Sequence, residues 1–132
     1  MKRLTTVIVL GGAILIMGAE SLLPQLVGQT CRGNTGLMNV VYTIDQKNGQ
    51  WVVHDLFGPQ NTAESNMKDV GWLPATVDGD SLTFQGMSSR ITLTAKDTHT
   101  VDAHFMQTNP EQPGVVDRTL TCTPTPAAQR WH

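Results

Sequence analysis

The fold is decided by residues 37–57, LMNVVYTIDQKNGQWVVHDLF. Apolar side chains alternate with other residues along both halves of this stretch, and a period of two is typical of β-strands. The dipeptide Asn48-Gly49 between the halves accepts the positive φ angles of a type I′ hairpin turn. A two-residue turn at this place would set Tyr42 opposite Asp55. We therefore predict an antiparallel hairpin whose inner face is apolar apart from that pair, and whose register is firmly held.

Alternating segments continue towards the C-terminus of the chain. They cover residues 81–85, 89–96, 99–107 and 115–122. Residues 72–77 form a poorer candidate, because Pro74 has no N–H for a ladder hydrogen bond and belongs at a sheet edge or outside the sheet. Short strands separated by regular turns are typical of antiparallel barrels and sandwiches.

We predict an all-β fold of about six to eight strands in a small antiparallel meander. The first and last strands of a meander meet only if the number of strands is even. Either residues 72–77 are then not a strand, or an eighth strand lies in 29–36 or 58–68. A closed or nearly closed β-barrel is the favoured form, with a β-sandwich as the alternative.

Two cysteines, Cys31 and Cys122, flank this series of strands. Outside the cytosol such a pair is usually oxidised, so we predict one disulfide that ties the first strand to the last. The segment before Cys31 lacks the pattern that precedes a lipidated cysteine, so no lipid anchor is expected there.

The N-terminus has the features of a secretory signal peptide. A basic start precedes an apolar run over residues 7–19, which is shorter than the roughly 20 apolar residues that span a bilayer. We predict a signal peptide over residues 1–21 with cleavage after Ser21, and no membrane span after cleavage. The rest would comprise a connector (22–30), a β domain (31–122) and a flexible C-terminal tail (123–132). A secreted or periplasmic location follows.

The charge distribution argues against several classes of function. Nine basic and eleven acidic residues are scattered through the chain, without a basic patch interleaved with aromatic residues. Nucleic-acid binding is therefore not expected.

Two charged residues fall on otherwise apolar strand faces: Asp55 and Arg118. If both side chains point inward, each needs a partner, because an unpaired buried charge is costly. Asp55 and Arg118 could pair with each other, or Tyr42 could donate to Asp55, either as a satisfied core pair or at the floor of a ligand pocket. Asp55 or Arg118 could instead lie at the barrel mouth with its charge in water. With a buried partner in place, Asp55→Asn is expected to destabilise the domain.

No arrangement of residues predicts a metal site, a cofactor or a reaction. Asp102 and His104 would share one strand face, but His99 would point to the other, so these groups do not converge as metal ligands do. Ser88 and Ser89 lack the surroundings of a nucleophilic serine.

A non-enzymatic exported binding or interaction module is the favoured function. We expect the loop 58–76 and the turn 108–114 to contact a protein or a small ligand in the cell envelope or outside the cell, with Trp72 as a possible partner contact. The alternatives are a small exported hydrolase that uses His54, Asp55 or His104, and a structural component of the envelope.

Overall fold

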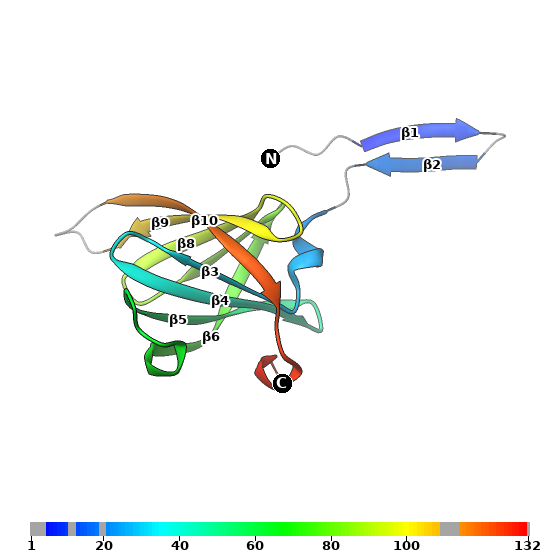
Figure 1. The fold of residues 1–132 in the computed structure, drawn as a ribbon. Coiled ribbons are helices and arrows are strands. Elements are labelled where there is room, and N and C mark those ends of the chain that lie inside the picture. The colour runs from blue at the N-terminus through cyan, green and yellow to red at the C-terminus, as the bar shows by residue number, and fades with distance from the viewer. Residues whose placement is uncertain (1–4, 11–12, 19–20, 109–113, 132) are drawn as a thin grey trace.

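The computed structural model describes residues 5–10, 13–18, 21–108 and 114–131. Eight of its strands form one closed antiparallel barrel, in which each strand pairs with its neighbours in the chain and the last strand pairs with the first (Figure 1). The barrel strands are β3 (Gln29–Asn34), β4 (Met38–Lys47), β5 (Gln50–Pro59), β6 (Lys68–Asp78), β7 (Ser81–Gln85), β8 (Ser89–Ala95), β9 (Thr100–Gln107) and β10 (Val115–Pro124). The prediction of an all-β closed barrel is confirmed.

The central hairpin has the predicted turn and register. Asn48 and Gly49 both have positive φ angles, 55° and 79°, as a type I′ turn requires. Tyr42 is the cross-strand partner of Asp55, and every pair from Met38 to Lys47 keeps the same register. The inward residues of both strands enter one core cluster, so a shift by one residue would expose them.

The eighth strand is β3, which lies within the range 29–36 that the sequence left open. The doubtful segment 72–77 is also a strand, as part of β6, and Pro74 lies within the barrel wall. Pro74 nevertheless has the edge position that the sequence predicted, for a local reason. Residues 68–75 of β6 pair with β5, whereas only residues 76–78 pair with β7. Pro74 therefore has a strand on one side only, and its missing N–H removes no bond to β7.

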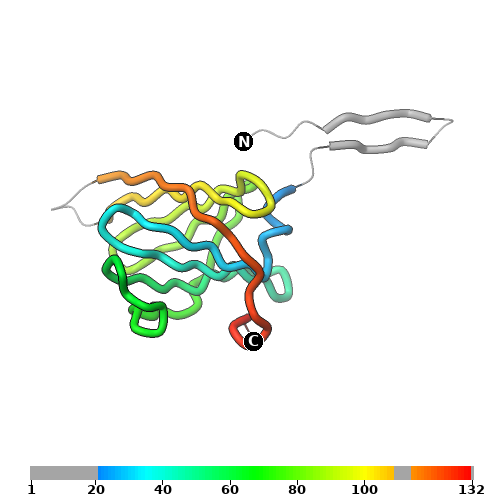
Figure 2. Tube along the Cα trace, in the orientation of Figure 1, coloured from blue at the N-terminus to red at the C-terminus, as the bar shows by residue number. Residues whose placement is uncertain are grey.

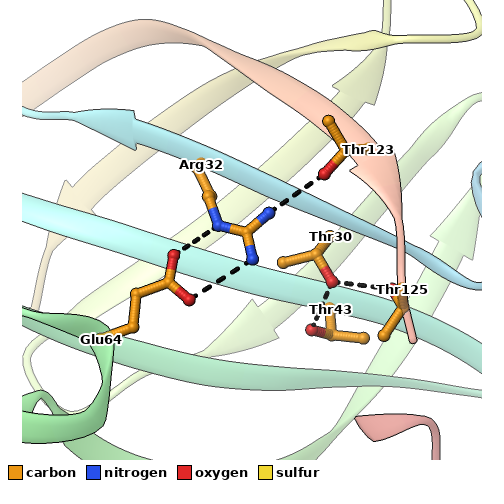
Figure 3. Close-up of polar contacts among 6 residues, drawn as sticks. All are labelled: Thr30, Arg32, Thr43, Glu64, Thr123 and Thr125. Atoms are coloured by element: carbon orange, nitrogen blue, oxygen red, sulfur yellow. Dashed lines mark hydrogen bonds and ion pairs between the residues drawn. The ribbon is translucent and has the colours of Figure 1, made fainter. Parts of the chain in front are cut away.

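Contacts inside and outside the barrel hold the join between β3 and β10 together. Cys31 and Cys122 are cross-strand partners and form the predicted disulfide. Outside the barrel, the Arg32 guanidinium donates to Glu64 of the short 3₁₀ helix η2 (Glu64–Asn66) and to Thr123 on β10 (Figure 3).

A chain of hydroxyl groups lies beside this arginine. The Thr30 hydroxyl on β3 is 3.0 Å from that of Thr43 on β4 and 2.7 Å from that of Thr125 after β10 (Figure 3). These contacts link three neighbouring segments across the join. They supplement a ladder in which only Arg32 to Gln29 of β3 pair with β10.

One end of the barrel is closed by residues of the predicted connector 22–30. The 3₁₀ helix η1 (Leu23–Leu26) places two leucines in the core, where they are 1 % and 0 % exposed. Asp80 helps to hold the start of this helix, because its carboxylate accepts hydrogen bonds from the Leu22 amide and the Ser21 hydroxyl. This segment therefore acts as a plug, which the sequence did not indicate.

The C-terminal residues contact the barrel wall along the described part 123–131. Arg130 donates two hydrogen bonds to the buried Asp45 carboxylate, at 2.6 and 2.9 Å, and the Trp131 amide donates a third. The sequence predicted a flexible tail over residues 123–132, since it shows no strand or helix period there. In the structure, Thr123 and Pro124 belong to β10, and the ion pair of Arg130 with Asp45 holds the end of the described segment. No periodicity reveals these contacts, and the flexibility of the tail stays a prediction.

Strands β1 (Thr5–Leu10) and β2 (Ala13–Gly18) pair with each other in a separate two-stranded sheet. They lie within residues 1–21, and the signal peptide predicted there stays a prediction. Among the described residues, no helix has the length and apolar character needed to cross a bilayer.

Candidate functional site

The two ends of the barrel differ in construction. The turns from β3 to β4, from β5 to β6 and from β7 to β8 lie at one end, which we call the mouth, whereas η1 and the C-terminus lie at the other (Figure 2). A cavity of about 170 Å³ opens at the mouth. It is lined by Thr35, Leu37, Met38, Val40, Tyr42, Asp55, Phe57, Gly86, Met87, Ser88, Ser89, Ile91, Phe105, Gln107 and Val116. The lining is largely apolar, with a few polar groups.

The floor of the cavity rests on an aromatic cluster. The ring of Tyr42 lies edge-on to that of Phe84, with centroids 5.3 Å apart, and tilted against that of Phe105 at 6.4 Å. All three residues are buried. Aromatic pairs at these distances and angles are favourable, so the floor is a packed and fixed surface.

Asp55 is the only acidic residue among the described residues that line the cavity. It is 2 % exposed, and its Oδ1 has no hydrogen-bond partner among the described residues. A buried polar atom without a partner costs free energy, and such atoms in native proteins call for a functional or solvent explanation. Asp55 is thus a polar group with unused hydrogen-bonding capacity inside an apolar cavity.

The backbone around Asp55 is irregular. The pairing of β5 with β6 shifts between Asp55 and Leu56, because β6 has an extra residue at this point. Gly71, which faces Asp55 across the strands, has a φ of 95° that other residues rarely adopt. Bulges of this kind are frequent next to functional sites, where they redirect side chains.

Burial determines the acid–base properties of the cavity floor. Desolvation raises the pKa of Asp55 to about 6, while the charges of His54 and Asp69 have smaller and opposing effects. Burial, together with the nearby Asp55 charge, also raises the pKa of Tyr42, so its phenol stays neutral. At neutral pH the floor combines a carboxylate with an uncharged hydroxyl.

Arg118 does not enter the cavity as a partner for Asp55. It is exposed, and its guanidinium donates to the backbone carbonyl of Asp117. An added Cβ on Gly36, in the turn from β3 to β4, would lie 3.3 Å from this guanidinium. Arg118 therefore lies at the mouth with its charge in water, which is one of the arrangements that the sequence suggested.

Trp72 lies on the outer wall of the barrel, away from the cavity. Its ring is stacked on that of His54 at 4.9 Å and tilted towards that of Trp131 at 6.3 Å. It is half-buried between these neighbours. Its use as a partner contact stays a prediction.

The histidines and acids form pairs on the outer wall. His54 Nε2 lies 2.7 Å from Asp69 Oδ1, and His104 Nδ1 lies 2.7 Å from Asp117 Oδ1. In the described part of the chain, no three groups of the metal-binding types come together. Neither pair opens into the cavity, so the convergence that would have favoured a hydrolase is not seen among these residues.

The two loops that we expected to contact a partner, 58–76 and 108–114, are not both seen as loops in the structure. Residues 58–76 are mostly strand, since β5 extends to Pro59 and β6 begins at Lys68, which leaves a short loop around η2. The turn 108–114 lies mostly outside the described residues. In the described turns at the mouth, the exposed apolar residues are instead Leu37 and Met87, which are 84 % and 62 % exposed.

The sequence indicated Asp55 and Tyr42 as a possible pocket floor but not the rim of that pocket. Leu37 and Met87 lie in turns, where single apolar residues carry no periodic signal. Leu37 and Met87 lie at the same end of the barrel because the turns from β3 to β4 and from β7 to β8 do. Only the order of the strands in the meander, and no local sequence pattern, shows this. No family model, no curated protein and no solved structure matches this chain.

Proposed function

We propose that the chain is an exported, non-enzymatic binding protein that holds a small, mainly apolar ligand at the mouth of its barrel. The observation that carries this proposal is the cavity, which is open at the mouth, lined mostly by apolar side chains and supplied with the buried carboxylate of Asp55. Ligand sites typically combine an apolar lining with a few placed polar groups, and the mouths of β-barrels are a common location for them.

The size of the cavity limits the ligand. At about 170 Å³ it is close to the apolar cavities of about 150 Å³ that bind benzene, and it is smaller than the sites of drug-sized molecules. The buried part of the ligand is therefore about one six-membered ring or an equivalent aliphatic group. Any longer part would extend past Leu37 and Met87, whose exposed side chains line the rim.

The proposed location outside the cytosol has two supports. One is the signal peptide predicted over residues 1–21. The other is the disulfide between Cys31 and Cys122, since such bonds persist in oxidising compartments. A secreted or a periplasmic protein would be consistent with both.

Two neighbouring valines allow a matched test. Val116 lines the cavity and is only half-buried, whereas Val115 does not line it and is 55 % exposed. Val116→Phe should fill the mouth without overpacking the core, and Val115→Phe should add the same group outside it. In an NMR titration with benzyl alcohol, we expect saturable amide shifts at Val40, Phe57 and Phe105, and none at Leu23 or Leu26 at the plugged end.

The expected affinity is weak, in the millimolar range or tighter, because so small a ligand offers few contacts. Val116→Phe should weaken it by about tenfold or more, while Val115→Phe should leave it unchanged. If benzyl alcohol produces no saturable shifts at the mouth of the unmodified protein, or if both variants bind it equally, the proposal is wrong.

A further inference from the structure

We infer that the ligand is a small apolar amine, whose cationic nitrogen binds the Asp55 carboxylate while its apolar part fills the cavity above it. The inference rests on the binding function proposed above and specifies the chemical class of its ligand. It is carried by the buried acceptor at the cavity floor and by the lack of a matching donor around it.

The Asp55 carboxylate requires a hydrogen-bond donor. An ionised carboxylate only accepts hydrogen bonds, and Oδ1 of this one receives none from the described residues. Burying a charge without a hydrogen-bonded partner is strongly unfavourable. A ligand that brings a donor to this atom therefore gains more from the contact than it would at an already satisfied group.

The charged side chains at the cavity favour a cationic ligand. None of the described residues that line the cavity is a lysine, arginine or histidine. Two basic side chains in its neighbourhood have other partners: Arg118 donates to the Asp117 carbonyl at the rim, and His54 faces Asp69 outside the barrel. Asp55 thus gives the described part of the cavity a negative charge at its floor, which a cationic ligand would neutralise and which would repel an anionic ligand.

The space beside the Asp55 carboxylate favours a compact donor group. Gly86, in the turn from β7 to β8, lines the cavity next to Asp55, and an added Cβ there would lie 3.3 Å from Asp55 Oδ2. The same Cβ would lie 3.1 Å from Ile91 Cδ1, so Gly86 packs closely here and a larger side chain would crowd the acid. An ammonium group is compact and carries up to three donors, so it fits this place better than a planar guanidinium.

Among ligands of the same shape, the strength of the hydrogen bond to Asp55 favours an amine. A neutral alcohol can donate one hydrogen bond to Asp55, but charge-assisted hydrogen bonds are roughly twice as strong as neutral ones. A carboxylate on the ligand would be repelled by Asp55 and could not donate. The expected order of affinity is therefore amine, then alcohol, then carboxylate.

The test compares benzylamine, benzyl alcohol and phenylacetate by calorimetric titration near pH 7.5, above the Asp55 pKa of about 6 and below that of an alkylamine. We expect benzylamine to bind about tenfold or more tightly than benzyl alcohol, and phenylacetate most weakly. Asp55→Asn keeps the shape of the side chain and removes its charge. In this variant benzylamine should lose its advantage, while benzyl alcohol should bind as before.

Asp78→Asn is the matched control, because Asp78 is an exposed acid at the end of β6 and does not line the cavity. It makes the same change of net charge and should preserve the preference for the amine. If benzyl alcohol binds at the mouth but benzylamine binds no better, or if Asp55→Asn keeps the amine preference, the inference is wrong and the proposed function survives. If benzyl alcohol does not bind at the mouth, the proposed function is wrong, and the inference that rests on it is wrong as well.

Discussion

Asp55 is almost fully buried, and its strand partner Tyr42 belongs to the packed aromatic floor of the cavity. The sequence placed this acid on an inward face and supposed that a partner would satisfy it. The structure confirms the burial but leaves Oδ1 without a hydrogen bond among the described residues. This difference reverses the expected effect of removing the charge, because an unsatisfied buried carboxylate opposes folding whereas a satisfied one supports it.

The pH dependence of stability should therefore include a contribution from Asp55. Its pKa is about 6 in the folded protein, above the value of about 4 expected for the unfolded chain, so the folded state binds more protons between these two values. The free energy of unfolding should fall as pH rises from about 4 through 6 on this account. At pH 7, Asp55→Asn should be more stable than the unmodified protein by up to about 3 kcal/mol.

Urea unfolding at a series of pH values measures this effect as the difference between the two proteins. The other groups near Asp55 are common to both: Tyr42 on β4, His54 and Asp69 on the outer wall, and Arg118 at the mouth. A difference that stays constant from pH 4 to 7 would mean that folding does not shift the pKa of Asp55, and a destabilised Asn variant at pH 7 would mean that the Asp55 carboxylate has a partner in the folded state.

At the scale of elements, the hairpin of β4 and β5 illustrates how a short turn fixes a long register. Gly49 has a φ of 79°, and no atom lies within 4 Å of the position that a Cβ would occupy. Any cost of a side chain there comes from the backbone alone. Ten consecutive residue pairs depend on this turn, including the pair of Tyr42 with Asp55 at the cavity floor.

Gly49→Ala should destabilise the protein by about 1 kcal/mol, because alanine resists a left-handed conformation. Gly114→Ala is the control, since Gly114 also has open space around it but no positive φ. It should be neutral or slightly stabilising. The midpoints of urea unfolding compare the two variants directly, and equal midpoints would contradict the role assigned to the turn.

The elements that the sequence predicted well are those with a strong local signal. The period of two and the Asn48-Gly49 dipeptide located β4 and β5 together with their register. By contrast, η1 and the C-terminal contacts depend on groups far apart in the chain, such as Asp80 beside Leu22 and Arg130 beside Asp45. Neither pair has a local pattern, because its members are 58 and 85 residues apart in the chain, respectively.

The whole molecule is a meander closed by one covalent bond. The Cys31–Cys122 disulfide joins the first barrel strand to the last, across 91 residues of chain. A cross-link of this span restricts the unfolded chain strongly, by about 4–5 kcal/mol in the loop-entropy description. The ladder between these strands is short, so the bond also fixes the join itself.

Replacing Cys31 and Cys122 together by alanine should lower the free energy of unfolding by about 4 kcal/mol. Both residues are buried, so alanine avoids placing a polar group in the core. Urea unfolding of the double variant, compared with the oxidised protein under the same conditions, measures the loss. A loss below about 1 kcal/mol would show that the strands hold the join without the disulfide.

The claim on which the functional account depends is that the mouth of the barrel accepts a small apolar amine, with its nitrogen against Asp55. An experimental structure of the protein with bound benzylamine tests this most directly. We predict the ring among Val40, Phe57 and Phe105, and the nitrogen within about 3 Å of an Asp55 oxygen. A ring bound on the outer wall beside Trp72, or a nitrogen directed into solvent at the mouth, would contradict the account.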